Sequence, residues 1–352
     1  MDTTLPAEPK VRGLSEVPFE FLSAKLHGRR SALYEGARLA DLAAFDSVQE
    51  LAYHLYPRAD IHDAVGLERQ LIASCVAELA HFLRYLSGAY ESLYVALLGR
   101  YAVDNLKVLL RLLGREDAEA QAERLLTPLP AELFLPVESL MSADGVGEFV
   151  GRIPLREVRD AALAAMPLYE ETGQGALLEM ALDRGHWAAV GAAVARLPGP
   201  ARTACSPPLA RELDSMRVLA ALRAARVYGM SWERVALLLP PGWGDLSDGA
   251  VREIHSRPEV GTVLERLPWL RGALPESEAA EAPIGRIEDA FMREVDRAAD
   301  RQYYAPYSEW SGPVILVSYF CLKRRELRRM VSLVQMVSRG TPRADVLAAL
   351  GL

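Results

Sequence analysis

Few residues of this sequence have the type and spacing needed to hold a metal ion. Glu78 and His81 stand three positions apart, and a Glu-x-x-His pair on a helix supplies ligands in di-iron helix bundles. Such a site needs two of these pairs and further glutamates, whereas this sequence contains one pair. The six histidines show no His-x-x-x-His spacing either. We therefore predict no metal site and interpret Glu78 and His81 as a solvated or interhelical pair.

Patterns that would indicate catalysis or nucleotide binding are also weak. Gly145, Gly147 and Gly151 form Gly-x-Gly-x-x-x-Gly, which differs from the dinucleotide-binding motif and has no strand before it. The sequence has no Walker A motif and no Gly-x-Ser-x-Gly elbow. Asp183 and His186 stand three apart, a spacing more typical of a surface pair on a helix than of a catalytic dyad. We predict no catalytic residue, no bound cofactor and no enzymatic activity of this chain.

The segment LKRRELRRMVSLVQMVSRG, residues 322–340, raises two alternatives. Five basic residues lie within seven positions, as in a phosphate-binding surface. An apolar stripe runs through the same segment and consists of Leu327, Met330, Val331, Val334 and Val337. The formal net charge of the chain is −7, which argues against a nucleic-acid binder. The same charge argues against a helix-turn-helix reading of the short helices expected at 231–238 and 342–350. The stripe favours a helix that forms one wall of a packed helical body.

The composition fits a folded protein without disulfides. Of the 352 residues, 51% are hydrophobic and 25% are charged. Cys75, Cys205 and Cys321 are far apart and form no Cys-x-x-Cys pair, so we expect three reduced thiols and a cytoplasmic location. We find no signal-peptide pattern and no run of 18 or more uncharged apolar residues, so we expect no membrane span.

Helix signals dominate the chain, and no alternation of strands and helices is visible, so we predict an all-α fold. The expected breaks are rich in proline and glycine and lie at 127–138, 197–208, 239–249 and 274–283. The predicted helices are 15–34, 47–55, 67–99, 102–113, 116–126, 155–166, 175–196, 209–228, 231–238, 284–302, 313–338 and 342–350.

A two-part pattern occurs three times along the chain. Its first part is Glu-x-x-apolar, beginning at Glu68, Glu179 and Glu288, and its second part is one of the tetrads DNLK, DSMR and RELR, residues 104–107, 214–217 and 325–328. The glutamate precedes the apolar residue of its tetrad by 38, 37 and 39 positions. The copies are about 110 residues apart, longer than ordinary solenoid repeats of roughly 20–50 residues. We therefore predict three similar helical units, at 1–126, 127–238 and 239–352, in a pseudo-threefold arrangement that forms a funnel, with the chain free to cross between units.

Several segments resemble one known family. FEFLSAKLHGRRSALYEG (19–36), DNLKVLLRLLG (104–114), LLEMALDRGHWAAV (177–190) and the segment 312–346 resemble the C subunit of the archaeal and bacterial A/V-type ATPase, whose eukaryotic relative is the d subunit of the vacuolar proton pump. The similarity spans nearly the whole chain. Asn105 matches the family pattern, but Ser215 and Glu326 stand at its counterparts in the later copies.

The resemblance implies a non-catalytic, all-α rotor protein of the central stalk. A protein of this kind couples the rotating axle to the membrane proteolipid ring in ATP-driven or ATP-producing ion transport. The implied partners are the axle subunits and the ring, with no nucleic acid, and the chain would be a monomer within the complex, cytoplasmic and peripheral to the membrane. The alternative is a soluble helical-repeat scaffold or adaptor protein on the same fold with other partners.

Basic residues recur near the same place in each predicted unit and are the candidate contacts with axle or ring. The plainer interpretation of each is a solvated helix face with local ion pairs, and the sharper one is a funnel lining that meets acidic groups of the partners. The candidates are Arg29, Arg30, Lys107, Arg111, Arg217, Arg328 and Arg329.

Overall fold

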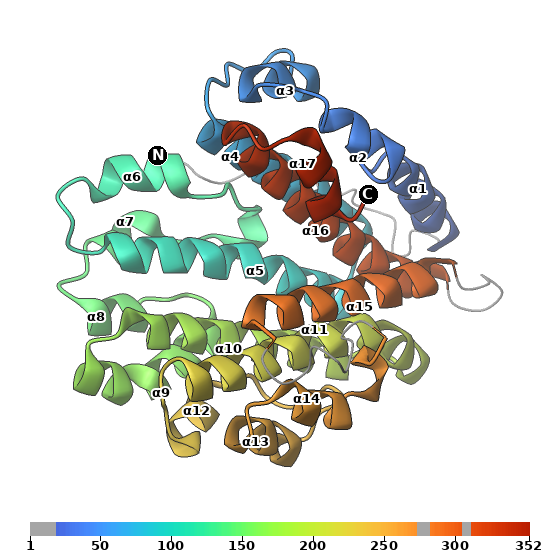
Figure 1. Cartoon of the computed structure of the whole chain (residues 1–352). Helices are drawn as coiled ribbons and strands as arrows, with labels where there is room; N and C mark the ends of the chain where they lie inside the picture. The colour runs from blue at the N-terminus through green and yellow to red at the C-terminus, as the bar shows by residue number, and fades with distance from the viewer. Residues whose placement is uncertain (1–18, 273–281, 305–310) are drawn as a thin grey trace.

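The computed structural model describes residues 19–272, 282–304 and 311–352, and these ranges contain helices and no β-strand (Figure 1). The predicted all-α fold is confirmed. The break expected at 274–283 lies almost entirely outside the described residues. The α-helices are α1 (Phe19–Ser31), α2 (Ala37–Leu42), α3 (Val48–Leu55), α4 (Ala64–Ala80), α5 (Gly88–Leu112), α6 (Ala118–Leu125), α7 (Val137–Met141), α8 (Val146–Gly151), α9 (Arg156–Thr172), α10 (Gly175–Ala195), α11 (Gly199–Arg226), α12 (Trp232–Leu238), α13 (Asp248–Ser256), α14 (Val260–Arg266), α15 (Ile284–Tyr304), α16 (Ser311–Ser338) and α17 (Arg343–Leu350), with short 3₁₀ helices η1 (His81–Tyr85), η2 (Ala131–Leu133) and η3 (Pro268–Leu270).

Several predicted helix boundaries are wrong, including the end of α9, which lies six residues beyond the predicted residue 166. The segment 67–99 is not one helix, because α4 gives way to η1 and α5 begins at Gly88, whose φ of 59° lies in the left-handed region that favours glycine. The helix α5 then continues through residues 100–102 without the expected break. The helix α11 begins at Gly199, ten residues earlier than predicted, and runs through Pro207 and Pro208. Those prolines lack an N–H but lie within a helix that continues on both sides.

Each copy of the sequence repeat falls on two successive long helices of the structure. Its glutamate lies on α4, α10 or α15, and its tetrad lies on α5, α11 or α16. A glycine with positive φ follows each of the second helices, at Gly114, Gly229 and Gly340, and ends it in the left-handed conformation that helix C-termini favour. A short helix comes next in every copy, namely α6, α12 or α17. The pseudo-threefold funnel built from these units stays a prediction.

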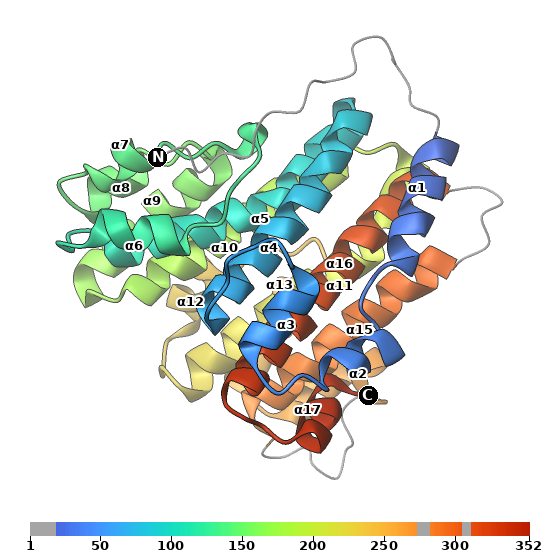
Figure 2. The same cartoon turned by 90° about the horizontal axis from the view of Figure 1, so that it is seen from above.

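The beginning and the end of the chain share one hydrophobic core. The helices α1 and α4 both pack along α16, as Figure 2 shows from above. Leu39 and Leu51 belong to the same buried cluster as Met330 and Leu333. The N-terminal helices therefore rely on the C-terminal helix for part of their core.

The middle of the chain packs α10 against α9 on one side and α5 on the other. Glycine lets α9 and α10 approach closely, because a Cβ added at Gly185 would lie 2.4 Å from the Cα of Val158. The helix α11 packs along α15, and residues of both contribute to a separate buried cluster with α13 and α14. Within the ranges that the structure describes, no helix combines the length and apolar character needed to cross a lipid bilayer.

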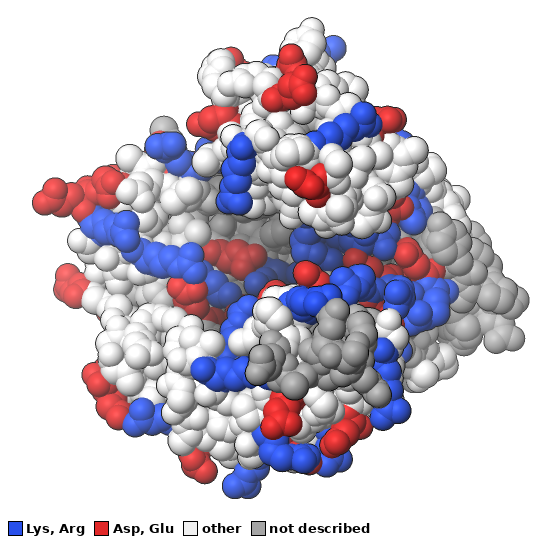
Figure 3. All heavy atoms as spheres, in the orientation of Figure 1, with Lys and Arg blue, Asp and Glu red and all other residues white. Residues whose placement is uncertain are grey.

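A hollow crosses the face of the molecule shown in Figure 3, and acidic and basic side chains gather along it. Comparison with Figure 1 places it between α16 and α17 on one side and α10 and α15 on the other. We call this feature the central hollow.

Candidate functional site

The basic run of α16 is divided among the helices that surround it. Arg325 and Arg328 pair with acidic residues on α15, Arg324 pairs with one on α11, and Lys323 pairs with one on α4. No two of these cations therefore share the same main acidic partner. Of the apolar stripe of the same helix, Met330, Val334 and Val337 are buried and Leu327 and Val331 are partly buried, so α16 contributes to the core. The pairs are Lys323 with Glu78 (3.0 Å), Arg324 with Glu212 (2.6 Å), Arg325 with Asp300 (3.0 Å) and Arg328 with Asp296 (3.2 Å).

The pair of Arg324 and Glu212 is largely withdrawn from solvent. Burial by itself would raise the pKa of the Glu212 carboxyl, but the charge and hydrogen bond of Arg324 outweigh burial and lower that pKa. Glu212 is therefore ionised at neutral pH, and its charge is matched by the arginine. Asp296 shows the opposite balance, because burial outweighs the nearby Arg328 and Arg325 and raises its pKa to about 6.

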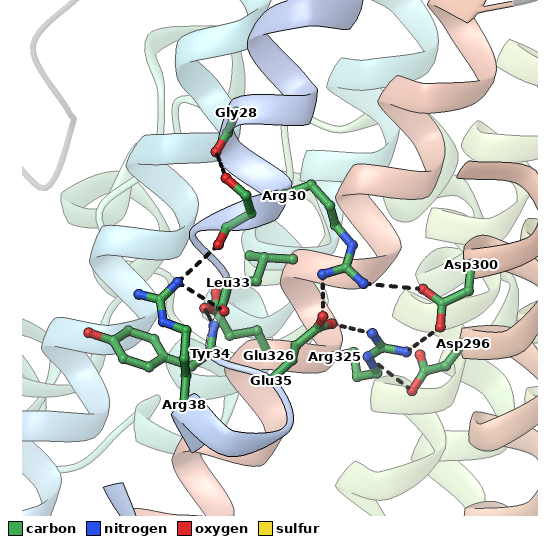
Figure 4. A network of polar contacts seen from close by, with 11 residues as sticks. Gly28, Arg30, Leu33, Tyr34, Glu35, Arg38, Asp296, Asp300, Arg325 and Glu326 are labelled. Carbon is green, nitrogen blue, oxygen red and sulfur yellow. Dashed lines mark hydrogen bonds and ion pairs between the residues drawn. The ribbon is translucent and has the colours of Figure 1, made fainter. Parts of the chain in front are cut away.

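A network of ion pairs joins α1, α15 and α16, and Figure 4 shows it from close by. Glu35, just after α1, accepts from both Arg30 and Arg325. Arg325 also donates to Asp300 at 3.0 Å, and its Nε lies 3.9 Å from Asp296. We call these five residues the clasp, because they tie the N-terminal helix to the C-terminal pair of long helices.

A second set of ion pairs joins α5 to α10. Asp183 on α10 accepts from Lys107 at 2.6 Å and from Arg100 at 3.1 Å. One turn earlier on α10, Glu179 binds Arg111 through two hydrogen bonds of 2.7 and 2.5 Å. Such a bidentate pair fixes the geometry of both side chains. Together with the pairs of α16, these contacts place charge along the helices that border the central hollow (Figure 3).

The candidate basic residues differ in how far solvent reaches them. The side chains of Arg111, Arg29 and Arg328 are 61%, 49% and 40% exposed. Arg30 and Lys107 are mostly buried in ion pairs. Arg329 is half-buried and makes no ion pair within the described ranges. Burial, followed by the charge of Arg325, lowers the pKa of the Arg329 guanidinium.

Arg217 lies in a different environment from its counterparts Lys107 and Arg328. Its side chain is 1% exposed, donates to the backbone oxygen of Leu246 at 2.5 Å and pairs with Asp248. Arg217 therefore binds the loop after α12 and does not lie on an outer face of the molecule. Equal spacing in the sequence has produced three different degrees of burial, and the interpretation as a solvated helix face is wrong for Arg217.

The loop after α12 is held by Asp214 as well. The carboxylate of Asp214 accepts from the backbone N–H groups of Asp245 at 2.7 Å and Leu246 at 3.2 Å. Gly244 permits this approach, since a Cβ there would lie 2.4 Å from the Asp214 carboxylate. Burial raises the pKa of Asp214 to about 6 despite these hydrogen bonds.

The two acid–histidine pairs singled out by spacing do not form in the structure. Glu78 accepts from Lys323 and Tyr319, whereas His81 contacts Lys25 at 3.0 Å. Asp183 pairs with Lys107 on α5, and His186 is buried against Gly99 of the same helix. Among the described residues, no group of three or more histidine, cysteine or acidic side chains has an arrangement that could hold a metal ion.

Sequence reasoning missed the acidic half of these networks. Glu35, Glu212, Asp296 and Asp300 are separated from their arginine partners on α16 by 25 to 290 positions. One signal was available for Asp296 and Asp300, which stand four apart on a predicted helix and so share a face. The pairing itself depends on how distant helices pack.

Comparison with known proteins identifies a family for this chain. The pattern of the ATP synthase (C/AC39) subunit family matches residues 22–348. A curated relative, the C subunit of the A-type ATP synthase of Methanobrevibacter smithii, is 26% identical over 170 residues. That alignment covers 47% of this chain and 44% of the relative, so the matched region spans less than half the length of each. Because the family pattern covers most of the chain, the protein belongs to the C/AC39 subunit family of the A/V-type ATPases.

Proposed function

We propose that this chain is a central-stalk rotor subunit of an A/V-type ATPase. In this role it couples the rotating axle to the membrane proteolipid ring during ATP-driven or ATP-producing ion transport. It contributes no catalytic residue and no cofactor, and it works as one copy on the cytoplasmic side of the membrane. The observation that carries the proposal is the family match over residues 22–348.

The charged helices around the central hollow support this function (Figure 3). A protein that couples two others must hold them through polar contacts that separately folded partners can make and release. It must also transmit torque without bending, and close-packed helices are stiff. The ion pairs of α16 and the clasp join helices from the beginning, middle and end of the chain, so load applied to one helix passes to the others.

The exposed arginines are the proposed partner contacts. Arg29, Arg111 and Arg328 keep a substantial part of their side chains in solvent, and Arg329 has no acidic partner within the described ranges. We expect acidic groups on the axle or ring to form ion pairs with the solvent-exposed sides of these arginines. Arg30 and Lys107 contribute by holding the helices in place. Arg217 reaches a partner only if the loop after α12 opens.

Reconstitution with the cognate axle subunits and proteolipid ring tests the proposal. We expect the chain to join the two in one complex. The combined substitutions Arg111→Glu and Arg328→Glu should weaken this assembly at least about tenfold, because acidic partners would then meet like charge. The matched control is Arg234→Glu on α12, whose arginine is also exposed and ion-paired, with Glu171 at 2.5 Å.

Two outcomes would count against the rotor function. Failure of the unmodified chain to bind either axle or ring would favour the alternative, a helical scaffold or adaptor protein with other partners. Equal assembly by the double variant and the control would retain the rotor function but remove these arginines as its contacts.

A further inference from the structure

A second concave feature lies between helices that also carry the ion pairs of Asp183. It is a cavity of about 200 Å³ between α5, α9 and α10. Small side chains form two of its walls, including Ala96 and Gly99 on α5 and Ala189 and Ala192 on α10. Larger side chains at these positions would fill the space, so the cavity follows from residue size rather than from loose packing.

One side chain in the wall is polar and lacks a partner. His186 lines the cavity and is 5% exposed, and within the described part of the chain neither of its ring nitrogens makes a hydrogen bond. The neighbouring Trp187 makes an edge-to-face ring contact with the His186 imidazole, with the two ring centroids 5.6 Å apart, and this contact is not a hydrogen bond. Polar groups in folded proteins are almost always hydrogen-bonded, and a ring nitrogen that faces an open space is paired by water or by a ligand. His186 therefore has one unused donor and one unused acceptor beside an open space.

The imidazole is neutral. Burial lowers its pKa well below the ordinary value for histidine, and the positive charges of Arg100, Arg324 and Lys107 lower it further. A neutral imidazole can donate through one nitrogen and accept through the other. It suits a hydroxyl group, which can also do both.

The rim and the volume narrow the class of ligand. Glu157 and Arg196 line the cavity and are exposed, and their opposite charges give the rim no net preference for an ion. A dry cavity of about 150 Å³ with apolar walls is large enough for benzene. A cavity of about 200 Å³ has room for such a ring with a small substituent.

We propose that the cavity between α5, α9 and α10 binds a small neutral ring compound carrying a hydroxyl group, with the hydroxyl hydrogen-bonded to His186. The apolar ring lies against the alanine and glycine walls. This site is separate from the proposed contacts with axle and ring, so either proposal can fail without the other.

Phenol and benzene are the probes that test it. The full chain, labelled with ¹³C in the rings of its six histidines, is titrated with each compound and followed by NMR. In a purely apolar cavity benzene would bind more tightly, because the phenol hydroxyl would lose its hydrogen bonds to water. With the hydroxyl bonded to His186, we expect phenol to bind about three- to tenfold more tightly than benzene and to shift the His186 resonance most.

Two variants separate the contributions of polarity and space. His186→Leu should reverse the order, so that benzene binds more tightly than phenol. Ala192→Phe should fill the cavity and abolish binding of both while keeping the imidazole. The proposal is overturned if phenol leaves the His186 resonance of the unmodified chain unmoved up to its solubility, or if benzene binds that chain as tightly as phenol. Unchanged phenol binding in Ala192→Phe would overturn it too, and the titrations of the unmodified chain decide the matter if a variant does not fold.

Discussion

Arg324 on α16 donates to the carboxylate of Glu212 on α11 across 2.6 Å, although the two residues are 112 positions apart in the chain. Both side chains are largely buried, and burial disfavours the charged form of each. The pair is favourable only because each charge compensates the other. It fixes the register of α16 against α11.

Removing one charge of this pair should destabilise the fold strongly. In Glu212→Gln the guanidinium of Arg324 stays buried without a counter-charge, and we expect the free energy of unfolding to fall by about 3 kcal/mol at pH 7. Urea unfolding followed by circular dichroism measures this. Glu179→Gln is the control, because its partner Arg111 is mostly exposed and the loss should stay below about 1 kcal/mol. Equal losses in the two variants would contradict the assignment.

Asp296 should make stability fall as pH rises. Its pKa of about 6 in the folded state lies above its ordinary value, so between about pH 4 and 6 the folded state binds more protons than the unfolded state. The stabilisation from the bound proton is complete below pH 4 and lost as pH rises through 6. Asp296→Asn should therefore flatten the pH dependence of stability in this window by about 1–3 kcal/mol. The control is Asp289→Asn, which replaces an exposed carboxyl. When the free energy of unfolding is measured from about pH 4 to 6, this variant should show the same dependence on pH as the unmodified chain.

Gly185 should tolerate no side chain. A Cβ at this position would meet the backbone of Val158 at 2.4 Å, and backbone atoms cannot rotate away as a side chain can. Gly185→Ala must therefore push α9 from α10, and we expect a loss of about 2–3 kcal/mol. Gly261→Ala is the control, because nothing lies within 4 Å of its added Cβ, and its stability should stay level or rise by less than about 1 kcal/mol. Thermal unfolding of both variants decides the point.

The clasp should control the opening of the N-terminal helices. Arg325→Ala removes the contacts to Glu35 and Asp300, so amide hydrogen exchange in α1 and α2 should become at least about tenfold faster. Exchange in α9 and α10 should not change, because these helices lie outside the clasp. The neighbouring Arg329→Ala, which removes no ion pair within the described ranges, should leave α1 unaffected.

Local sequence signals predicted much of the helical layout. The segments 175–196, 284–302 and 313–338 lie within two residues of α10, α15 and α16, because each has continuous helical periodicity and ends at a glycine, a proline or a loop. The break before Gly88 escaped notice because apolar residues continue through η1 at helical spacing. The early start of α11 escaped notice because Pro207 and Pro208 resemble a loop signal.

The charged networks were less accessible to sequence reasoning. Lys107, Arg217 and Arg328 occupy matching places in the repeat, yet Lys107 lies against α10, Arg217 is enclosed by the loop after α12, and Arg328 stays partly in solvent. Burial of a helix face depends on which neighbours pack against it, and periodicity along one segment does not contain that information. The cavity beside His186 escaped prediction for the same reason, because its walls come from three helices.

The shared core of Leu39, Leu51, Met330 and Leu333 has a consequence for how the protein is made. During synthesis the first helices leave the ribosome long before α16 exists, and the part of their apolar surface that Met330 and Leu333 cover then has no partner. Contacts between residues so far apart in sequence close late and slow the folding of a chain. We therefore expect the newly made N-terminal helices to keep part of their apolar surface exposed until α16 has been synthesised, an interval that favours binding to chaperones.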